Sequence, residues 1–87
     1  MKVEIYTKPS CPYCIQAKIL LKNKNVEIVE HTIGINNITK ETVQQLVNNL
    51  GLTTEVRTVP QIFLHKEDQV VYIGGYTDLV AKQSLLD

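Results

Sequence analysis

Two cysteines, Cys11 and Cys14, are the residues of this chain best suited to covalent chemistry, and they are its only cysteines. Pro12 and Tyr13 separate them. The thiolate form of cysteine is the nucleophile of thiol–disulfide exchange. Residues i and i+3 share one face of a helix, so two thiols at this spacing near a helix start lie within disulfide reach of each other. The spacing therefore predicts a pair that opens and closes without a large backbone movement.

The flanking sequence predicts that a strand delivers the cysteines to the start of a helix. The apolar run Val3–Tyr6 precedes them, and the helix-like stretch Ile15–Lys24 follows them. Backbone N–H groups at a helix N-terminus lack intrahelical partners and carry part of the helix dipole, so they favour a thiolate over a thiol. We therefore expect Cys11, the cysteine nearer to the cap, to be the nucleophile, and Cys14, one turn further in, to be the resolving thiol.

The neighbours of the cysteines fit this interpretation, and each also fits a purely structural role. Lys8, three residues before Cys11, adds positive charge. Pro12 pre-sets φ at the first helical position, as it would in any helix start. Tyr13 is expected to border the thiol site and contact a bound peptide, although an exposed aromatic residue at a helix start is also common without a binding role. The alternative for the cysteines themselves is a pair of small buried apolar residues or half of a metal site.

Length, charge and cysteine usage limit the class of protein. A chain of 87 residues predicts one domain spanning 1–87. Nine basic and nine acidic residues give zero net charge, and no run of like charges is longer than a pair, which argues against a nucleic acid or a membrane surface as partner. We find no signal-peptide pattern and no long apolar span, so we expect a cytoplasmic location. There a Cys-x-x-Cys pair indicates redox activity rather than a structural staple.

Hydrophobic periodicity in the first half of the chain predicts a βαβ unit. Lys2–Thr7 alternates as a strand does, and Val26–Ile33 is rich in β-branched residues. Between them, Tyr13–Lys24 has apolar residues at helical spacing, with Ile15 and Ile19 as a flanking pair, so we expect this helix to be largely buried. The two strands must then be parallel, with a right-handed crossover.

The second half of the chain predicts a helix and a hairpin. Thr39 is a suitable N-cap, an apolar stripe at helical spacing follows it, and Gly51 closes the helix. Gln61–Leu64 and Gln69–Ile73 are short apolar strands joined by a polar connection, so they should pair antiparallel.

A final helix completes the predicted order βαβαββα. We expect Thr77 or Asp78 to cap it and the helix to reach about Leu86. The predicted fold class is α/β, a four-stranded mixed sheet with helices on both faces.

Three separated motifs resemble the glutaredoxins, and the likeness covers nearly the whole chain. The first is Val3–Lys8 followed by Cys11–Cys14, which looks like the first strand and active site of a dithiol member. Thr58-Val59-Pro60 before Gln61–Phe63 resembles the loop and strand that carry the family's cis-proline. Gly74-Gly75 before Thr77-Asp78 resembles its glutathione-binding turn. The compact length is similar to that of bacterial and bacteriophage members.

The resemblance implies a thioredoxin-like fold and a glutathione-dependent thiol-disulfide oxidoreductase. Its substrates would be protein disulfides and glutathione mixed disulfides, and ribonucleotide reductase would be one plausible protein partner. Glutathione would be the co-substrate, no metal would be required, and the protein would act as a monomer in the cytoplasm, or in the host cytoplasm if it is of phage origin. The resemblance also implies a cis bond at Val59–Pro60, where the sequence alone favours an ordinary trans turn.

Glutathione carries two carboxylates and one ammonium group, and the resemblance places charged groups for all three. Lys8 and Arg57 would meet the glycine carboxylate, and backbone N–H groups of Thr77 and Asp78 the γ-glutamyl carboxylate, with the Asp78 side chain on the ammonium. Without the resemblance, Lys8 and Arg57 are equally well explained as solvated surface charges and Asp78 as a helix cap. Val59, before Pro60, has backbone groups free to pair with an extended peptide. The full predicted set is Lys8, Tyr13, Arg57, Thr58, Val59, Pro60, Gly75, Thr77 and Asp78.

One departure from the family pattern concerns the segment before this loop. Residues 51–56 intervene between the second helix and Arg57, where the family usually has a short link. The insertion leaves open whether Gln44 or Gln45 of that helix reaches a ligand.

A binding module is the rival function. In it Cys11, together with glutathione thiols, would hold an iron–sulfur cluster shared across a dimer. Pro12 argues against this, because the resemblance links cluster-holding members to a small residue at that position. His31 and His65 do not have the spacing of a Cys₂His₂ zinc site.

Overall fold

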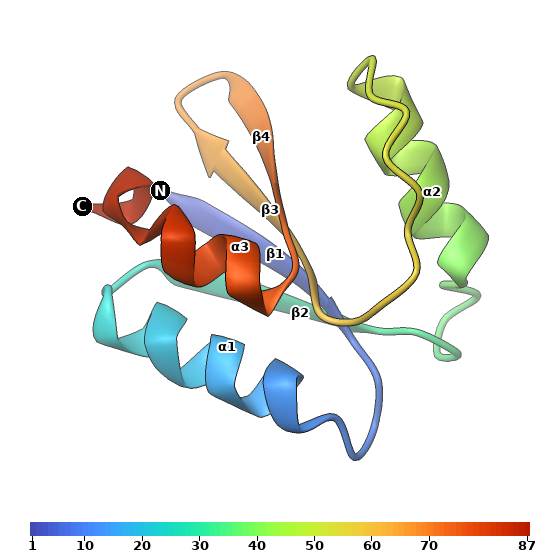
Figure 1. Cartoon of the computed structure of the whole chain (residues 1–87), viewed down its shortest axis with the longest axis horizontal. Helices are drawn as coiled ribbons and strands as arrows, with labels where there is room; N and C mark the ends of the chain where they lie inside the picture. The colour runs from blue at the N-terminus through green and yellow to red at the C-terminus, as the bar shows by residue number, and fades with distance from the viewer.

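A four-stranded mixed sheet organises the protein, as the computed structural model of all residues 1–87 shows (Figure 1). The strand order is β2-β1-β3-β4; β1 pairs parallel with β2 and antiparallel with β3, and β3 pairs antiparallel with β4. The elements along the chain are β1 (Lys2–Thr7), α1 (Pro12–Asn23), β2 (Glu27–Thr32), α2 (Lys40–Asn49), β3 (Gln61–Lys66), β4 (Gln69–Gly74), α3 (Tyr76–Ala81) and a final 3₁₀ turn, η1 (Gln83–Leu86). The predicted order βαβαββα is confirmed.

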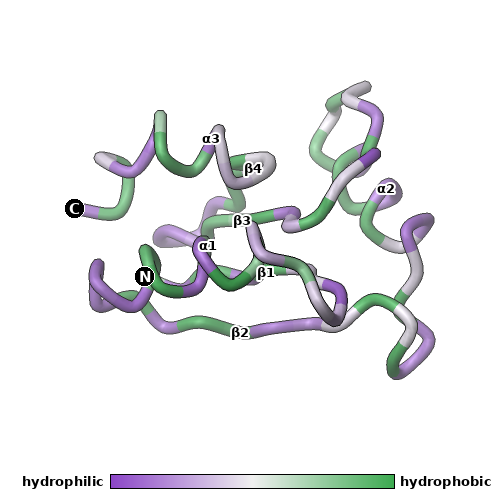
Figure 2. Tube along the Cα trace, turned by 60° about the horizontal axis from the view of Figure 1, so that its bottom comes forward, coloured by the Kyte–Doolittle hydropathy of each residue, from purple (hydrophilic) through white to green (hydrophobic).

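Each face of the sheet has its own core, and helices cover both faces, as predicted (Figure 1). On one face, α1, α3 and the turn η1 pack over β1, β3 and β4 through nine buried residues, which are Val3, Ile5, Ala17, Leu21, Ile62, Leu64, Ile73, Leu79 and Leu86. On the other face, α2 packs through Val43 and Val47 on Tyr6 and Phe63. The central strand β3 therefore has consecutive apolar residues, with Ile62 and Leu64 in one core and Phe63 in the other, whereas the edge strand β2 is mixed (Figure 2).

The expectation that α1 is largely buried is wrong. Only Cys14, Ala17 and Leu21 of this helix are buried, and Ile15 and Ile19 are 55% and 56% exposed. The physical reason is the position of β2. It is the last strand on its side of the sheet, so no further element covers the flank of α1 that carries the two isoleucines.

The predicted cap of the last helix is also wrong. Gly75 is the N-cap of α3, and the backbone N–H of Gly75 donates a hydrogen bond to the Asp78 carboxylate at 3.1 Å. Thr77 and Asp78 therefore lie inside the first turn. Gly74 has φ +113°, and a Cβ there would lie 2.5 Å from an Asp78 carboxylate oxygen, so the turn needs glycine at this position.

The hairpin is tighter than predicted. The strands β3 and β4 extend to Lys66 and from Gln69, so only Glu67 and Asp68 connect them, with Glu67 at φ 57°. None of the helices has both the length and the apolar character needed to cross a membrane.

Candidate active site

Cys11 occupies the N-cap of α1, as the sequence predicts. Its sulfur accepts a hydrogen bond from the backbone N–H of Cys14 at 3.2 Å, and Pro12 takes the first helical position. A disulfide joins Cys11 to Cys14, whose Cα atoms are 5.2 Å apart. Cys11 is half-buried and Cys14 is 2% exposed. An incoming disulfide can therefore reach Cys11 more easily than Cys14.

A loop from a distant part of the chain completes the surroundings of the disulfide. The carbonyl oxygen of Val59 lies 3.8 Å from the Cys11 sulfur, although 48 positions separate them in the sequence. The Val59–Pro60 bond is cis, as the family resemblance implies and contrary to the trans turn that the sequence alone favours. The loop passes directly into β3, a central strand, which fixes its position beside α1.

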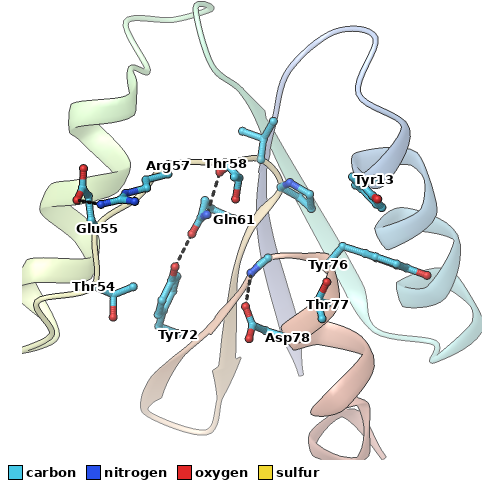
Figure 3. Close-up of a pocket in the computed structure, with 13 residues that line it drawn as sticks. Tyr13, Thr54, Glu55, Arg57, Thr58, Gln61, Tyr72, Tyr76, Thr77 and Asp78 are labelled. Atoms are coloured by element: carbon cyan, nitrogen blue, oxygen red, sulfur yellow. Dashed lines mark hydrogen bonds and ion pairs between the residues drawn. The ribbon is translucent and has the colours of Figure 1, made fainter.

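A cavity of about 390 Å³ lies beside this loop, and most of the predicted ligand-binding residues line it (Figure 3). It is lined by Tyr13, Thr54, Glu55, Arg57, Thr58, Val59, Pro60, Gln61, Tyr72, Gly75, Tyr76, Thr77 and Asp78. Of the predicted set, only Lys8 is missing. Lys8 instead lines a separate hollow together with both cysteines.

Sequence reasoning missed several residues of the cavity wall. Tyr76 stacks on Tyr13, with ring centroids 5.7 Å apart. The Gln61 side-chain amide donates to the Thr58 carbonyl at 2.9 Å and accepts from the Tyr72 hydroxyl. The available signal was position: Tyr76 interrupts the Gly-Gly and Thr-Asp motif, and Gln61 directly follows the Thr-Val-Pro loop.

Burial and the negative charge of Asp78 raise the pKa of Tyr72 above its ordinary value. Its hydroxyl therefore stays protonated near neutral pH and remains a donor to Gln61.

Charges of both signs line the cavity. The Arg57 guanidinium lies 2.7 Å from the Glu55 carboxylate. The hydrogen bond between them, reinforced by their opposite charges, raises the pKa of Arg57 and lowers that of Glu55. Asp78 lies apart from this pair, at the start of α3 (Figure 3). The wall thus carries one cation, Arg57, paired with Glu55, and a second anion, Asp78, at a separate place.

Neither helix glutamine considered from the sequence lines the cavity. Gln44 donates to the Thr54 carbonyl at 2.9 Å and accepts from the Val56 N–H at 2.7 Å. Gln45 bonds only to Asn49 of the same helix. Gln44 therefore ties α2 to the inserted segment 51–56, which leads into Arg57.

No three His, Cys, Asp or Glu side chains gather in a way that would hold a metal ion. The two histidines instead share a carboxylate on the sheet: His31 and His65 lie 2.8 and 2.6 Å from the two oxygens of Glu4.

Comparisons with known proteins place this site in a family. Residues 3–69 match the family model described as glutaredoxin. The chain is 43% identical over 79 residues to glutaredoxin 3 of Escherichia coli, covering 91% of this chain and 82% of that protein. It is 40% identical over 85 residues to glutaredoxin 1 of Rickettsia prowazekii, covering 95% and 80%. Among solved structures, glutaredoxin 1 from Francisella tularensis aligns with a TM-score of 0.73 at 34% identity, over 98% of this chain and 94% of that one.

Proposed function

This chain belongs to the glutaredoxin family and is a thiol-disulfide oxidoreductase with a thioredoxin-like fold, and we propose that glutathione is the thiol that supplies its electrons. One observation carries the proposal. The Cys11 sulfur lies against the Val59 carbonyl, and Val59 is itself part of the wall of the cavity of about 390 Å³. A tripeptide bound in that cavity would therefore have its central thiol within reach of Cys11.

The charges of the wall fit the charges of glutathione. Arg57 would pair with the glycine carboxylate by exchanging its bond to Glu55 for one to the ligand, and Asp78 would take the ammonium group. Backbone N–H groups of Thr77 and Asp78 would meet the γ-glutamyl carboxylate. Lys8 is not part of this arrangement, because it lies outside the cavity.

The other predicted wall residues would hold the rest of the peptide. Val59 would pair through its backbone with the cysteinyl residue of glutathione, and Thr58 and Pro60 shape the wall on either side of it. Gly75 has no side chain to occupy the space next to Pro60, where a Cβ would be in ordinary contact with the Pro60 carbonyl oxygen at 3.5 Å. Tyr13, which is 60% exposed and stacked on Tyr76, would cover the ligand from the α1 side.

The proposed reaction proceeds by two-electron exchange. The Cys11 thiolate attacks one sulfur of a substrate disulfide, forms a mixed disulfide and expels the other sulfur as a thiolate, which takes up a proton. A glutathione thiolate can then attack the partner sulfur of the mixed disulfide, which frees the Cys11 thiolate and leaves the partner sulfur in a disulfide with glutathione; when the adduct is glutathione, this product is glutathione disulfide. Alternatively, Cys14 attacks the Cys11 sulfur and releases the reduced substrate. When Cys14 does so, the disulfide between Cys11 and Cys14 forms. Two glutathione molecules reduce it and leave as glutathione disulfide.

The proposal also covers the assembly, the location and the substrates of the protein. We propose that residues 1–87 act as one glutaredoxin unit, as a monomer in the cytoplasm. Protein disulfides and glutathione mixed disulfides are the proposed substrates. Ribonucleotide reductase is the protein substrate that the family resemblance predicts.

The deciding experiment is reduction of a small glutathione mixed disulfide with glutathione as the only electron source. We expect catalytic turnover that saturates with glutathione. A parallel assay with dithiothreitol reports thiol-disulfide exchange that does not depend on glutathione recognition. Turnover with dithiothreitol and none with glutathione would show that the electron donor is a different thiol.

A further inference from the structure

A groove along α1 and β2 borders the same disulfide on a face separate from the glutathione cavity. Its larger hollow, of about 460 Å³, is lined by Ile15, Lys18, Ile19, Lys22, Ile28 and Glu30. We call this hollow, together with the adjoining one described next, the α1–β2 groove. A second hollow, of about 320 Å³, shares Ile15, Lys18 and Glu30 with it and continues to Cys11 and Cys14. Neither hollow shares a lining residue with the cavity of Figure 3.

The groove carries exposed apolar side chains beside its charged ones. Ile15, Ile19 and Ile35 are each more than half exposed. Ile15 lines both hollows, Ile19 lines the larger one and Ile35 lines the smaller one. Single exposed apolar side chains are common on protein surfaces, but a contiguous group of them marks an interaction site. The isoleucines of α1 are also those that the sequence alone predicts to be buried, and no element of the chain covers them.

The charge of the groove is positive. Lys18 pairs with Glu30 at 3.1 Å, and Glu30 also accepts a hydrogen bond from the Thr7 hydroxyl at 2.7 Å, so these two charges offset each other. Lys8 and Lys22, which line the two ends, form no salt bridge. An occupant that also carries carboxylates would satisfy both lysines.

We propose that the α1–β2 groove is the docking surface for protein substrates and that it takes a segment flanking the reactive disulfide in which apolar and acidic side chains alternate. The proposal rests on the proposed function, because it assigns the protein partner of the same disulfide. Since the groove and the glutathione cavity share no residue, a docked protein and glutathione can occupy the enzyme together. A second copy of this chain is a poorer occupant, because a symmetric contact would place the Lys22 side chains of both copies in one positive interface.

The test compares two synthetic peptides that each contain one intramolecular disulfide and one tryptophan. In one peptide the flanking segment alternates leucine and glutamate, and in the other lysine replaces each glutamate. The KM for peptide reduction is measured for the unaltered protein and for Ile19→Ser and Lys22→Glu. Val80→Ser and Lys66→Glu are matched controls, because both residues are exposed and lie outside the groove.

We expect the acidic peptide to have the lower KM. Ile19→Ser should raise it about fivefold, the loss expected when about half an isoleucine side chain is no longer covered. Lys22→Glu should raise it by a similar factor at low salt and less at high salt. The control variants should leave it unchanged. Equal KM values for the two peptides, or equal effects of groove and control variants, would overturn the proposal.

Further measurements distinguish weaker docking from slower turnover and from dimer formation. The protein has no tryptophan, so the peptide tryptophan reports binding directly, even if turnover fails. Turnover of a small glutathione mixed disulfide tests the proposed function independently, and Ile19→Ser should leave it unchanged. Sedimentation velocity is the last readout: a shift from dimer to monomer in Ile19→Ser would show that a second copy covers the groove and would overturn the proposal.

Discussion

At the scale of single residues, the chemistry depends on the position of one sulfur atom. The Cys11 sulfur accepts the Cys14 N–H at the start of α1, whereas the Cys14 side chain is buried. The first feature stabilises a thiolate and the second hinders attack from outside. The proposed division of roles between the two cysteines therefore rests on one helix terminus.

The first prediction concerns the reactivity of Cys11 after reduction. In Cys14→Ser, the rate of alkylation by iodoacetamide should reach half its maximum well below about pH 8.5, the value for an unperturbed cysteine. Cys11→Ser serves as the control, because its remaining Cys14 thiol is 2% exposed and should alkylate slowly at every pH. An ordinary thiol curve in Cys14→Ser would remove the argument from the helix terminus.

The second prediction separates two roles of Asp78. Its carboxylate accepts the Gly75 N–H at 3.1 Å, so alanine would remove both the cap and the charge. Asn keeps an acceptor oxygen. Asp78→Asn should lower kcat/KM for a glutathione mixed disulfide about tenfold, within the range for loss of a charge-assisted contact, and leave Tm nearly unchanged.

Asp78→Ala should show the same kinetic loss and also lose about 1 kcal/mol of unfolding free energy. Asp68→Asn, in the β3–β4 turn, is the matched control and should change neither quantity. Normal kinetics in Asp78→Asn would place the ammonium group of glutathione elsewhere.

At the scale of elements, one side chain joins α2 to the loop that leads to the active site. Gln44 satisfies the N–H of Val56, which is 2% exposed. Gln44→Ala should lower the free energy of unfolding by about 1–3 kcal/mol, because it leaves that N–H without a partner. The same variant should also raise the KM for glutathione, since Val56 directly precedes Arg57, the proposed partner of the glycine carboxylate.

Gln45→Ala is the matched control, because Gln45 bonds only to Asn49 within its own helix. Chemical denaturation gives the stability of both variants, and amide hydrogen exchange at Val56 should be faster only in Gln44→Ala. Equal stability of the two variants would show that the inserted segment does not depend on Gln44.

A fourth prediction concerns the carboxylate that joins three strands. Burial opposes ionisation of Glu4, but the hydrogen bonds and charges of His31 and His65 outweigh it and hold its pKa below the ordinary 4.5. A carboxyl group whose pKa is lowered on folding stabilises the protein above its unfolded pKa, and the contribution disappears as pH falls through the folded value. Glu4→Gln should therefore cost about 1 kcal/mol while Glu4 is ionised, and this cost should fall as the pH drops below the ordinary 4.5 toward pH 3.

Urea unfolding at a series of pH values measures this difference. Glu27→Gln is the control, because Glu27 is exposed on β2 and has no side-chain partner. A constant cost of Glu4→Gln from pH 7 to pH 3 would contradict the assignment.

At the scale of the whole molecule, the arrangement of two cysteines and the two proposed binding surfaces predicts two mechanisms. A second glutathione can release an adduct of Cys11 with glutathione, so Cys14→Ser should keep at least half of the activity on glutathione mixed disulfides. Release of a protein adduct needs a nearby thiol at high effective concentration, so the same variant should lose about tenfold or more on an intramolecular protein disulfide.

Cys11→Ser should be inactive on both substrates, because no other activated thiol remains. Steady-state rates on both substrates check this prediction. Activity in Cys11→Ser together with loss in Cys14→Ser would show that the nucleophile has been assigned to the wrong cysteine.

The sequence by itself determined the features that depend on local chain chemistry. The spacing of Cys11 and Cys14, the proline at the first helical position and the cap at Thr39 are each read within one turn of a helix, and the structure has all three. Alternation predicted β1, β-branched residues predicted β2, and two short apolar runs with a polar connection predicted the hairpin of β3 and β4. The order of elements and the mixed sheet followed from these.

Only the tertiary structure decided which distant groups meet. Val59 reaches the Cys11 sulfur because β3 lies beside β1 in the centre of the sheet, and no local pattern encodes that distance. Lys8 and Arg57, predicted to share a ligand, line different hollows, which no local pattern encodes either. Periodicity shows that Ile15 and Ile19 flank a helix face, but their exposure depends on β2 being an edge strand. Burial is a property of what packs nearby, and neighbours in space are set by the whole chain.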